Sequence, residues 1–129
     1  MQVSESVQLV EDLVGHFPVL QDAYDSHIFN EGGVLPHVFF WDLTQEVIRA
    51  FISGGGEALD WKGVLDFLEE RIGAGNQEVV EVIVTSFLSY MPYPTQSGYH
   101  LVDELGAVMS RRFRDLRGGG DSPPVLFIW

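Results

Sequence analysis

Residues 77–91, with the sequence QEVVEVIVTSFLSYM, constrain the fold of this chain more than any other segment. A helix built from them is apolar on nearly every side, because its polar strip consists only of Glu78, Glu81, Thr85 and Ser89. A helix with so little polar surface belongs at the centre of a bundle. The run VVEVIVT is rich in β-branched residues, so a buried strand is the alternative. Because the pattern continues unbroken to Met91, we favour a helix.

The remainder of the chain is patterned as helices separated by glycine and proline. Apolar residues at three- and four-residue intervals predict helices over 4–15, 18–29, 36–53, 61–72 and 97–117. Glycines and prolines lie between these segments and mark the ends of the helices. Asn76 and Ser97 are suitable N-caps for the fifth and sixth helices. The sequence therefore predicts one all-α domain over 1–117, a bundle of about six helices around a central hairpin formed by the fourth and fifth.

The end of the chain, GGGDSPPVLFIW at 118–129, combines a Gly/Pro linker with five apolar residues. A free tail would expose those apolar residues to water, which is unfavourable. We expect this extended segment to pack either on its own bundle or on a neighbouring molecule. Self-association through the tail is therefore left open.

Three aromatic residues in a row, Phe39 to Trp41, raise a geometric difficulty in the third predicted helix. Consecutive helical residues are about 100° apart, so three side chains cannot all enter one narrow apolar stripe. Either this helix is buried on two sides or one ring points outward. Since aromatic side chains usually serve the core, we expect burial between neighbouring helices.

Net charge is the strongest signal in the composition. The chain carries a formal charge of −12, and residues 1–100 hold 15 of its 19 acidic side chains but only three of its seven basic ones. A surface of this kind repels nucleic acid and attracts basic partners. It could equally serve only to keep the protein in solution.

Several classes of protein are disfavoured by what the sequence lacks. There is no cysteine, which excludes disulfides and thiol catalysis and is compatible with a cytoplasmic protein. No apolar run reaches the roughly 18 residues of a membrane span. No G-x-S-x-G nucleophile motif or phosphate-binding glycine loop is present. We therefore expect neither an enzyme nor a cofactor.

The four histidines do not form a metal-binding pattern. They fall on different predicted elements, at His16, His27, His37 and His100. Two of them have a carboxylate at helical i,i+4 spacing, in the pairs Asp12 with His16 and His100 with Glu104. We interpret these pairs as local hydrogen bonds or ion pairs rather than metal or proton-transfer sites.

Three short motifs carry a resemblance to a known group of proteins. They are LPH-x-FF-x-D-L at Leu35–Leu43, LDFLEE at Leu65–Glu70 and SFL at Ser86–Leu88. Over roughly residues 10 to 110 the chain resembles a family of small helical bacterial domains, some of which accompany toxin and immunity genes. The resemblance implies an immunity protein that binds a basic toxin domain and blocks it. None of the motifs is a catalytic signature.

Two sets of residues are candidates for the functional site. An acidic partner-binding surface on the fourth helix and the start of the fifth would use Asp60, Asp66, Glu69, Glu70, Glu78 and Glu81. The alternative is a small-ligand-binding protein or enzyme with a pocket lined by His37, Phe39, Phe40, Trp41 and Trp61. A flat acidic surface would favour the first, and a pocket with converging polar groups the second.

Overall fold

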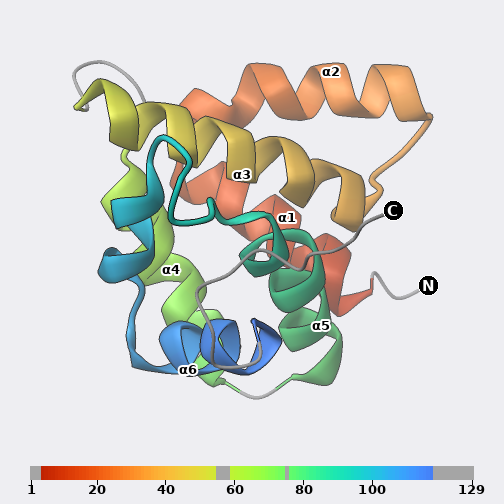
Figure 1. The fold of residues 1–129 in the computed structure, drawn as a ribbon. Helices are drawn as coiled ribbons and strands as arrows, with labels where there is room; N and C mark the ends of the chain where they lie inside the picture. The colour runs from red at the N-terminus through yellow and green to blue at the C-terminus, as the bar shows by residue number, and fades with distance from the viewer. Residues whose placement is uncertain (1–3, 55–58, 75, 118–129) are drawn as a thin grey trace, which may run out of the picture.

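A computed structural model describes residues 4–54, 59–74 and 76–117, and in those ranges the chain is helical without strands (Figure 1). The elements are α1 (Glu5–His16), η1 (Pro18–Leu20), α2 (Gln21–Glu31), α3 (Pro36–Ser53), α4 (Trp61–Gly73), α5 (Gln77–Ser86), η2 (Leu88–Tyr90), η3 (Tyr99–Glu104) and α6 (Ala107–Leu116), where η marks a short 3₁₀ helix. The all-α prediction is confirmed. The predicted packing of the tail at 118–129 lies outside the described residues.

The fifth helix lies at the centre of the bundle, as its apolar sequence predicts. It packs against α1, α3, α4 and α6 (Figure 1). Val82 and Ile83 are almost completely buried between these neighbours. Its exposed strip contains Glu78, Glu81 and Thr85, the polar residues identified from the sequence.

The fifth helix is shorter than predicted, because it ends at Ser86 rather than near Met91. The hydroxyl of Thr44 on α3 donates to the carbonyl of Phe40 at 2.7 Å and also lies 3.2 Å from the carbonyl of Ser86, an oxygen that a continuing helix would use itself. The hydroxyl of Thr85 also donates to a carbonyl one turn earlier, which favours bending. The chain continues as η2, and Phe87 turns its fully buried ring toward Phe40.

The predicted boundaries of two other helices are also corrected. Residues 18–20 form a 3₁₀ turn, so α2 begins only at Gln21. Its last residue is Glu31, and Gly32 caps its end with a left-handed φ of 77°. The helix predicted from Ser97 is split. Residues 99–104 form η3, and α6 begins only at Ala107.

The cap of α6 comes from a different helix. Ser4, Asp60 and Asn76 cap α1, α4 and α5 by local side-chain bonds, Asn76 as predicted. At the start of α6, the N-cap residue is Gly106, and no neighbouring side chain accepts a hydrogen bond from the first turn. Instead, Glu69 on α4 accepts the backbone N–H groups of Val108 and Met109 at 2.7 and 3.0 Å.

The three consecutive aromatic residues of α3 divide between core and surface. Phe39 and Phe40 are buried at 2% and 0% exposure, whereas Trp41 is 45% exposed. The expectation that all three rings are buried is therefore wrong for Trp41. Its indole points outward and meets the Tyr90 ring edge-on, with centroids 6.4 Å apart. The helical angle between neighbouring residues allows two of the rings, but not three, to reach this core.

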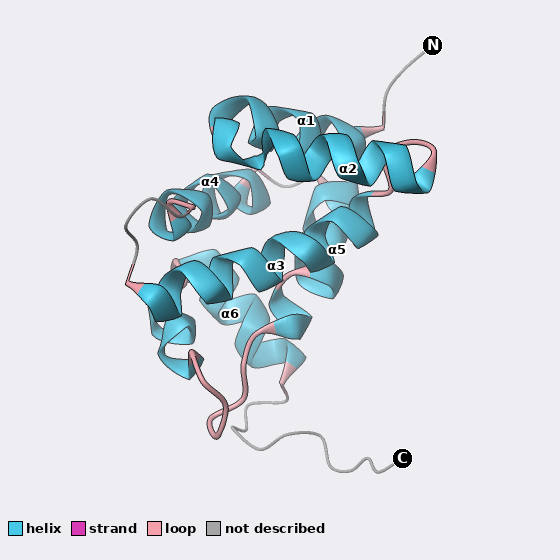
Figure 2. Ribbon diagram, turned by 90° about the horizontal axis from the view of Figure 1, so that it is seen from above, coloured by secondary structure: helices cyan, strands magenta, loops and turns pink. Residues whose placement is uncertain are grey.

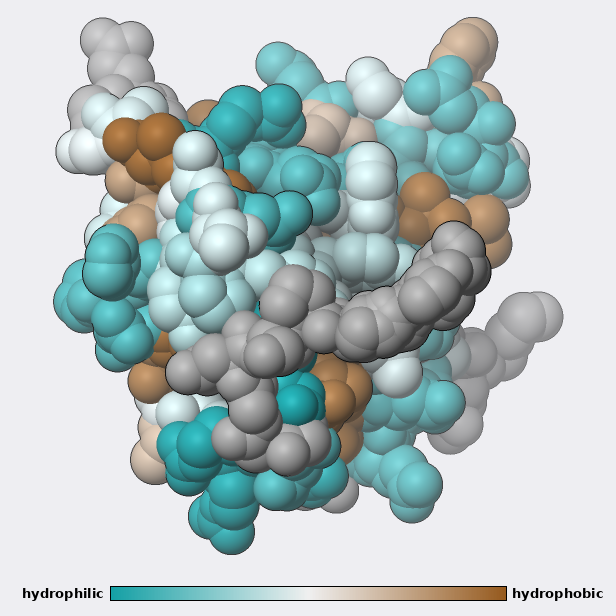
Figure 3. Space-filling view, in the orientation of Figure 1, coloured by the Kyte–Doolittle hydropathy of each residue, from teal (hydrophilic) through white to brown (hydrophobic). Residues whose placement is uncertain are grey.

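The second helix is attached to one side of the bundle. It packs against α1 and η1, and Figure 2 shows it lying beside α1. It meets α3 through Tyr24 and His27, whose rings lie edge-on against Phe39. His27 is its only residue that is fully buried in the described structure. In the view of Figure 3 most of the surface is hydrophilic, and hydrophobic patches appear at the two ends of α3. Ile52 is exposed at one end, and Leu35 and Val38 at the other.

Candidate functional site

Two hollows beside α1 and α4 are lined by carboxylates. A hollow of about 420 Å³ between the two helices is lined by Asp60, Asp66 and Glu70. A smaller one of about 120 Å³ is lined by Glu5 and Asp12. Arg71 lines both hollows, so they adjoin. We call the five carboxylates that line the two hollows, together with Arg71 between them, the acidic seam. Among the described residues, Arg71 is the only arginine that lines either hollow.

The single arginine of the acidic seam is already engaged. One terminal nitrogen of Arg71 lies 2.9 Å from a carboxylate oxygen of Asp12, and its guanidinium lies 4.5 Å from the centroid of the Phe67 ring. Partial burial would raise the pKa of Asp12, but hydrogen bonds from Gln8 and Arg71 outweigh it, so the pKa of Asp12 lies below its ordinary value. Asp66 and Glu70 have no basic partner among the described residues.

The partner of Asp12 corrects a prediction from the sequence. The i,i+4 spacing favoured a local pair with His16, but Asp12 instead binds Gln8 and Arg71. His16 packs its ring against Phe17 and Phe67 at centroid distances of 4.9 and 5.2 Å. The hollow therefore has an aromatic wall beside its carboxylates. The other predicted pair also changes partner, since Glu104 lies 3.5 Å from Lys62 and His100 faces Asp103.

Of the six carboxylates predicted to bind a partner, the structure brings three together. Asp60, Asp66 and Glu70 line the larger hollow, and Asp60 also accepts the N–H of Gly63 at 3.0 Å as the cap of α4. Glu69 is half-buried and occupied by the start of α6. Glu81 is exposed on α5 but does not line either hollow of the acidic seam.

Glu78 is also committed to an internal contact. Its carboxylate accepts the backbone N–H of Ser6 at 2.9 Å and the hydroxyl of the same residue, so it ties α5 to the first turn of α1. The Ser6 side-chain bond, followed by its backbone bond, lowers the pKa of Glu78 from its ordinary value. Glu78 therefore contributes to helix capping, and we omit it from the acidic seam.

Two members of the acidic seam, Glu5 and Asp12, were absent from the predicted site. They are seven residues apart on α1, and this spacing places them on one helix face. The sequence therefore held a signal for their grouping. Their position beside Asp66 and Glu70 depends on the packing of α1 against α4, which no local pattern reveals.

The residues of the alternative aromatic pocket do not surround one cavity. Phe39 and Phe40 are core residues, and Trp61 packs edge-on against Phe51 with centroids 4.9 Å apart. His37, at the start of α3, is hydrogen-bonded to Ser86. Trp41 alone of the five lines a hollow described below. Phe39 and Phe40 thus share the core, whereas His37, Trp41 and Trp61 each have different neighbours.

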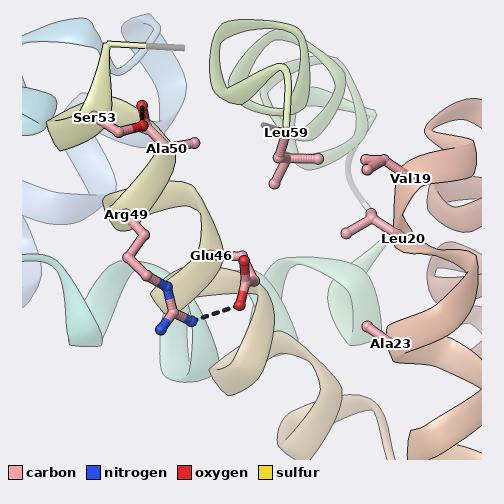
Figure 4. Close-up of a pocket in the computed structure, with 8 residues that line it drawn as sticks. All are labelled: Val19, Leu20, Ala23, Glu46, Arg49, Ala50, Ser53 and Leu59. Carbon is pink, nitrogen blue, oxygen red and sulfur yellow. Dashed lines mark hydrogen bonds and ion pairs between the residues drawn. The ribbon is translucent and has the colours of Figure 1, made fainter. Parts of the chain in front are cut away.

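A different hollow runs between α2 and α3 (Figure 4). Its first part, of about 390 Å³, is lined by Val19, Leu20, Ala23, Glu46, Arg49, Ala50, Ser53 and Leu59. Its second part, of about 530 Å³, is lined by Ala23, Ser26, His27, Asn30, Glu31, Trp41, Asp42, Gln45, Glu46 and Arg49. Since both parts share Ala23, Glu46 and Arg49, they form one continuous depression, which we call the α2–α3 groove.

The described ranges contain neither a cluster of potential metal ligands nor a helix that could span a membrane. In 4–54, 59–74 and 76–117, no group of three or more histidines and carboxylates has an arrangement that could hold a metal ion. Within the same part of the chain, every helix is too short or too polar to cross a bilayer.

Comparison with known proteins adds no identification. No protein-family model, no curated protein and no solved structure matches this chain. The relationship to toxin-associated immunity domains remains a prediction from the three sequence motifs.

Proposed function

We propose that this protein binds a basic partner protein through the acidic seam and has no catalytic activity of its own. The observation that carries the proposal is that five carboxylates of α1, α4 and the cap of α4 line two adjoining hollows in which Arg71 is the one described guanidinium: Glu5, Asp12, Asp60, Asp66 and Glu70. Carboxylates placed side by side raise the local concentration of a cationic partner and steer its approach. Nucleic acid would be repelled by the same field.

The wall of the larger hollow adds a reason to expect a lysine or arginine side chain there. Phe67 and His16 present rings beside Asp66 and Glu70. A long cationic side chain can place its methylene stem on such rings while its charged end meets the carboxylates. A volume of about 420 Å³ is sufficient for one such side chain.

The resemblance to immunity domains suggests the kind of partner. On that basis we propose that the partner is a toxin made by the same bacterium, and that binding in the cytoplasm blocks it. Inhibition would then result from covering a basic surface of the toxin. The proposal requires neither a metal nor a cofactor.

The test compares two charge-reversed variants as baits. D66K/E70K changes the acidic seam, and D103K/D115K changes two exposed carboxylates outside α1 and α4 by the same formal charge. We expect wild type and D103K/D115K to capture one basic protein from the native host, and D66K/E70K to lose it. Association of the purified pair should slow as salt concentration rises.

The identity of the captured protein decides the finer proposal. A toxin encoded by the adjacent upstream gene, whose activity is blocked by the wild-type protein, would support immunity. Equal capture by both variants would place the contact elsewhere and overturn the acidic seam as the binding site. A failure to capture any partner, together with a neighbouring gene of ordinary metabolism, would argue against the immunity function itself.

A further inference from the structure

The second helix has an unusual composition on its inner side. A surface helix normally buries a stripe of large apolar residues, but the side of α2 that faces α3 presents Ala23, Ser26, His27 and Asn30. Only His27 is fully buried, and its Nε2 accepts the N–H of Leu35 at 2.9 Å. The helix is therefore held to the bundle by His27 and the half-buried Tyr24, with small and polar side chains around them.

These small side chains leave the α2–α3 groove unfilled. Figure 4 shows Val19, Leu20 and Ala23 facing Ala50 and Glu46 across the depression. Close approach of another chain is possible at such a place, because alanine and serine project little beyond the backbone. A groove between two helices is a common binding site for a helix of a partner protein.

One end of the α2–α3 groove is apolar. Leu20, Ala50 and Leu59 line its floor and are mostly buried, and Val19 stands at the rim with 59% of its side chain exposed. Burial of Val19 by a partner would remove apolar surface from water, at about 25 cal/mol per Å². This end therefore favours aliphatic side chains.

The other end of the α2–α3 groove is acidic. Glu31, Asp42 and Glu46 line it, and the one basic residue present, Arg49, is already paired with Glu46. Glu31 and Asp42 have no basic partner in the described chain. Trp41 stands at the same end with its ring half-exposed, and such rings are frequent anchors in protein interfaces. The charge at this end is complementary to lysine and arginine.

We infer that the α2–α3 groove binds a helix of a partner protein that carries aliphatic residues along one half of its contact face and lysine or arginine along the other. This site shares no residue with the acidic seam, so the inference does not rest on the proposed function. The aliphatic half lies over Val19, Leu20 and Leu59. The basic half lies over Glu31 and Asp42, beside Trp41.

The probe is a fluorescent helical peptide of about 18 residues, with leucines at three- and four-residue intervals in one half and lysines in the other. It is made in both orders, since the direction of the bound helix is open, and also with glutamate in place of lysine. We expect the full-length protein to bind one lysine peptide at least about tenfold more tightly than its glutamate analogue. Amide shifts in a two-dimensional NMR spectrum should concentrate in α2 and α3.

Two variants assign the binding to the α2–α3 groove. Ala23→Trp fills it, and Ala107→Trp adds the same ring at an exposed alanine at the start of α6. We expect Ala23→Trp to weaken binding about tenfold or more and Ala107→Trp to leave it unchanged. The charge-reversed variant E31K/D42K should prefer the glutamate peptide.

Several results would overturn the inference. They are failure of every lysine peptide to bind, equal binding of the lysine and glutamate peptides, and equal binding by Ala23→Trp and wild type. A peptide of residues 118–129 is a separate competitor. If it displaces the lysine peptide and binds the groove more tightly, the occupant is the end of this chain, and a partner helix is excluded.

Discussion

The Glu69 carboxylate on α4 receives the backbone N–H of Val108 at 2.7 Å, so the first turn of α6 is capped by another helix. The next amide, of Met109, donates to the other oxygen at 3.0 Å. The four N–H groups at the start of a helix have no partner within it, and an anion there also interacts favourably with the helix dipole. Glu69 thus couples the position of α4 to the beginning of α6.

Removal of this cap should destabilise the protein. We expect Glu69→Ala to lower the free energy of unfolding by about 1–2 kcal/mol, the usual range for loss of a helix cap. Glu70→Ala is the matched control, because Glu70 is exposed and no side-chain hydrogen bond joins it to another helix within the described part of the chain. Its effect should stay within about 0.5 kcal/mol. Equal losses for the two variants in urea denaturation would contradict the capping role.

A double-mutant cycle that combines Gly106→Ala with Glu69→Ala can test the same cap. A Cβ at Gly106 would lie 2.4 Å from the carboxyl carbon of Glu69, so Gly106→Ala should displace the carboxylate and destabilise the protein. The backbone of Gly106, with φ of −70°, is accessible to alanine. In the Glu69→Ala background the same change should be neutral or stabilising, because alanine reduces the entropy of the unfolded chain. Equal costs in both backgrounds would argue against steric displacement.

Phe87 provides a test of the core. Its ring is completely buried and lies 6.5 Å from the Phe40 ring, centroid to centroid. We expect Phe87→Ala to cost about 3–5 kcal/mol through the lost contacts and the cavity that remains. Phe29→Ala is the control for the same chemical change, since Phe29 is 87% exposed. A loss below about 1 kcal/mol at Phe87, measured by chemical denaturation, would be incompatible with its burial.

The contact between Glu78 and Ser6 predicts a dependence on pH. The pKa of Glu78 is lowered in the folded protein, so its contribution to stability is present above the ordinary value of 4.5 and is lost as pH falls through the lowered value. Ser6→Ala removes the hydroxyl bond and should bring that pKa back toward 4.5. The stability difference between wild type and Ser6→Ala should therefore shrink on acidification from pH 7 to pH 3.

A serine without an ionisable partner serves as the control for that experiment. Ser53 donates its hydroxyl to the carbonyl of Ala50 at 3.2 Å. Any loss of stability in Ser53→Ala should therefore be nearly constant over the same pH range. If the Ser6→Ala difference is equally constant in thermal unfolding, Glu78 does not titrate through this contact.

Metal removal should leave the protein unchanged. The described residues hold no cluster of potential metal ligands, and the chain has no cysteine. We expect dialysis against a chelator to alter neither the melting temperature nor the helical circular dichroism. A fall of many degrees that added zinc reverses would show that a metal contributes to folding.

The sequence predicts the central helix of this fold better than its boundaries. The position of α5 follows from its apolar surface, because a segment such as Val82–Ile83 has few other places to be buried. At the end of α5, the Ser86 carbonyl lies 3.2 Å from the Thr44 hydroxyl, which comes from 42 residues away. The start of α6 depends on Glu69, so local cap signals such as Ser97 were misleading there.

The candidate site shows the same division between local and distant information. Periodicity correctly places Asp66 and Glu70 at the surface, and they meet in one hollow with Asp60. It also placed Glu69 and Glu78 there. Glu69 is half-buried and Glu78 is exposed, but both accept backbone N–H groups of another helix, and the local sequence pattern does not mark this. Only tertiary contacts distinguish a carboxylate that caps a helix from one available to a partner.

The attachment of α2 has a consequence for the order in which the molecule opens. Its interior contacts are few, being the buried His27, the half-buried Tyr24 and their edge-on rings against Phe39. Amide hydrogens of such a segment exchange with solvent through local opening, at a lower free energy than global unfolding. Amides of α5, surrounded by α1, α3, α4 and α6, are released only when the bundle itself comes apart. We therefore expect α2 to open as a separate cooperative unit while the remaining helices stay packed.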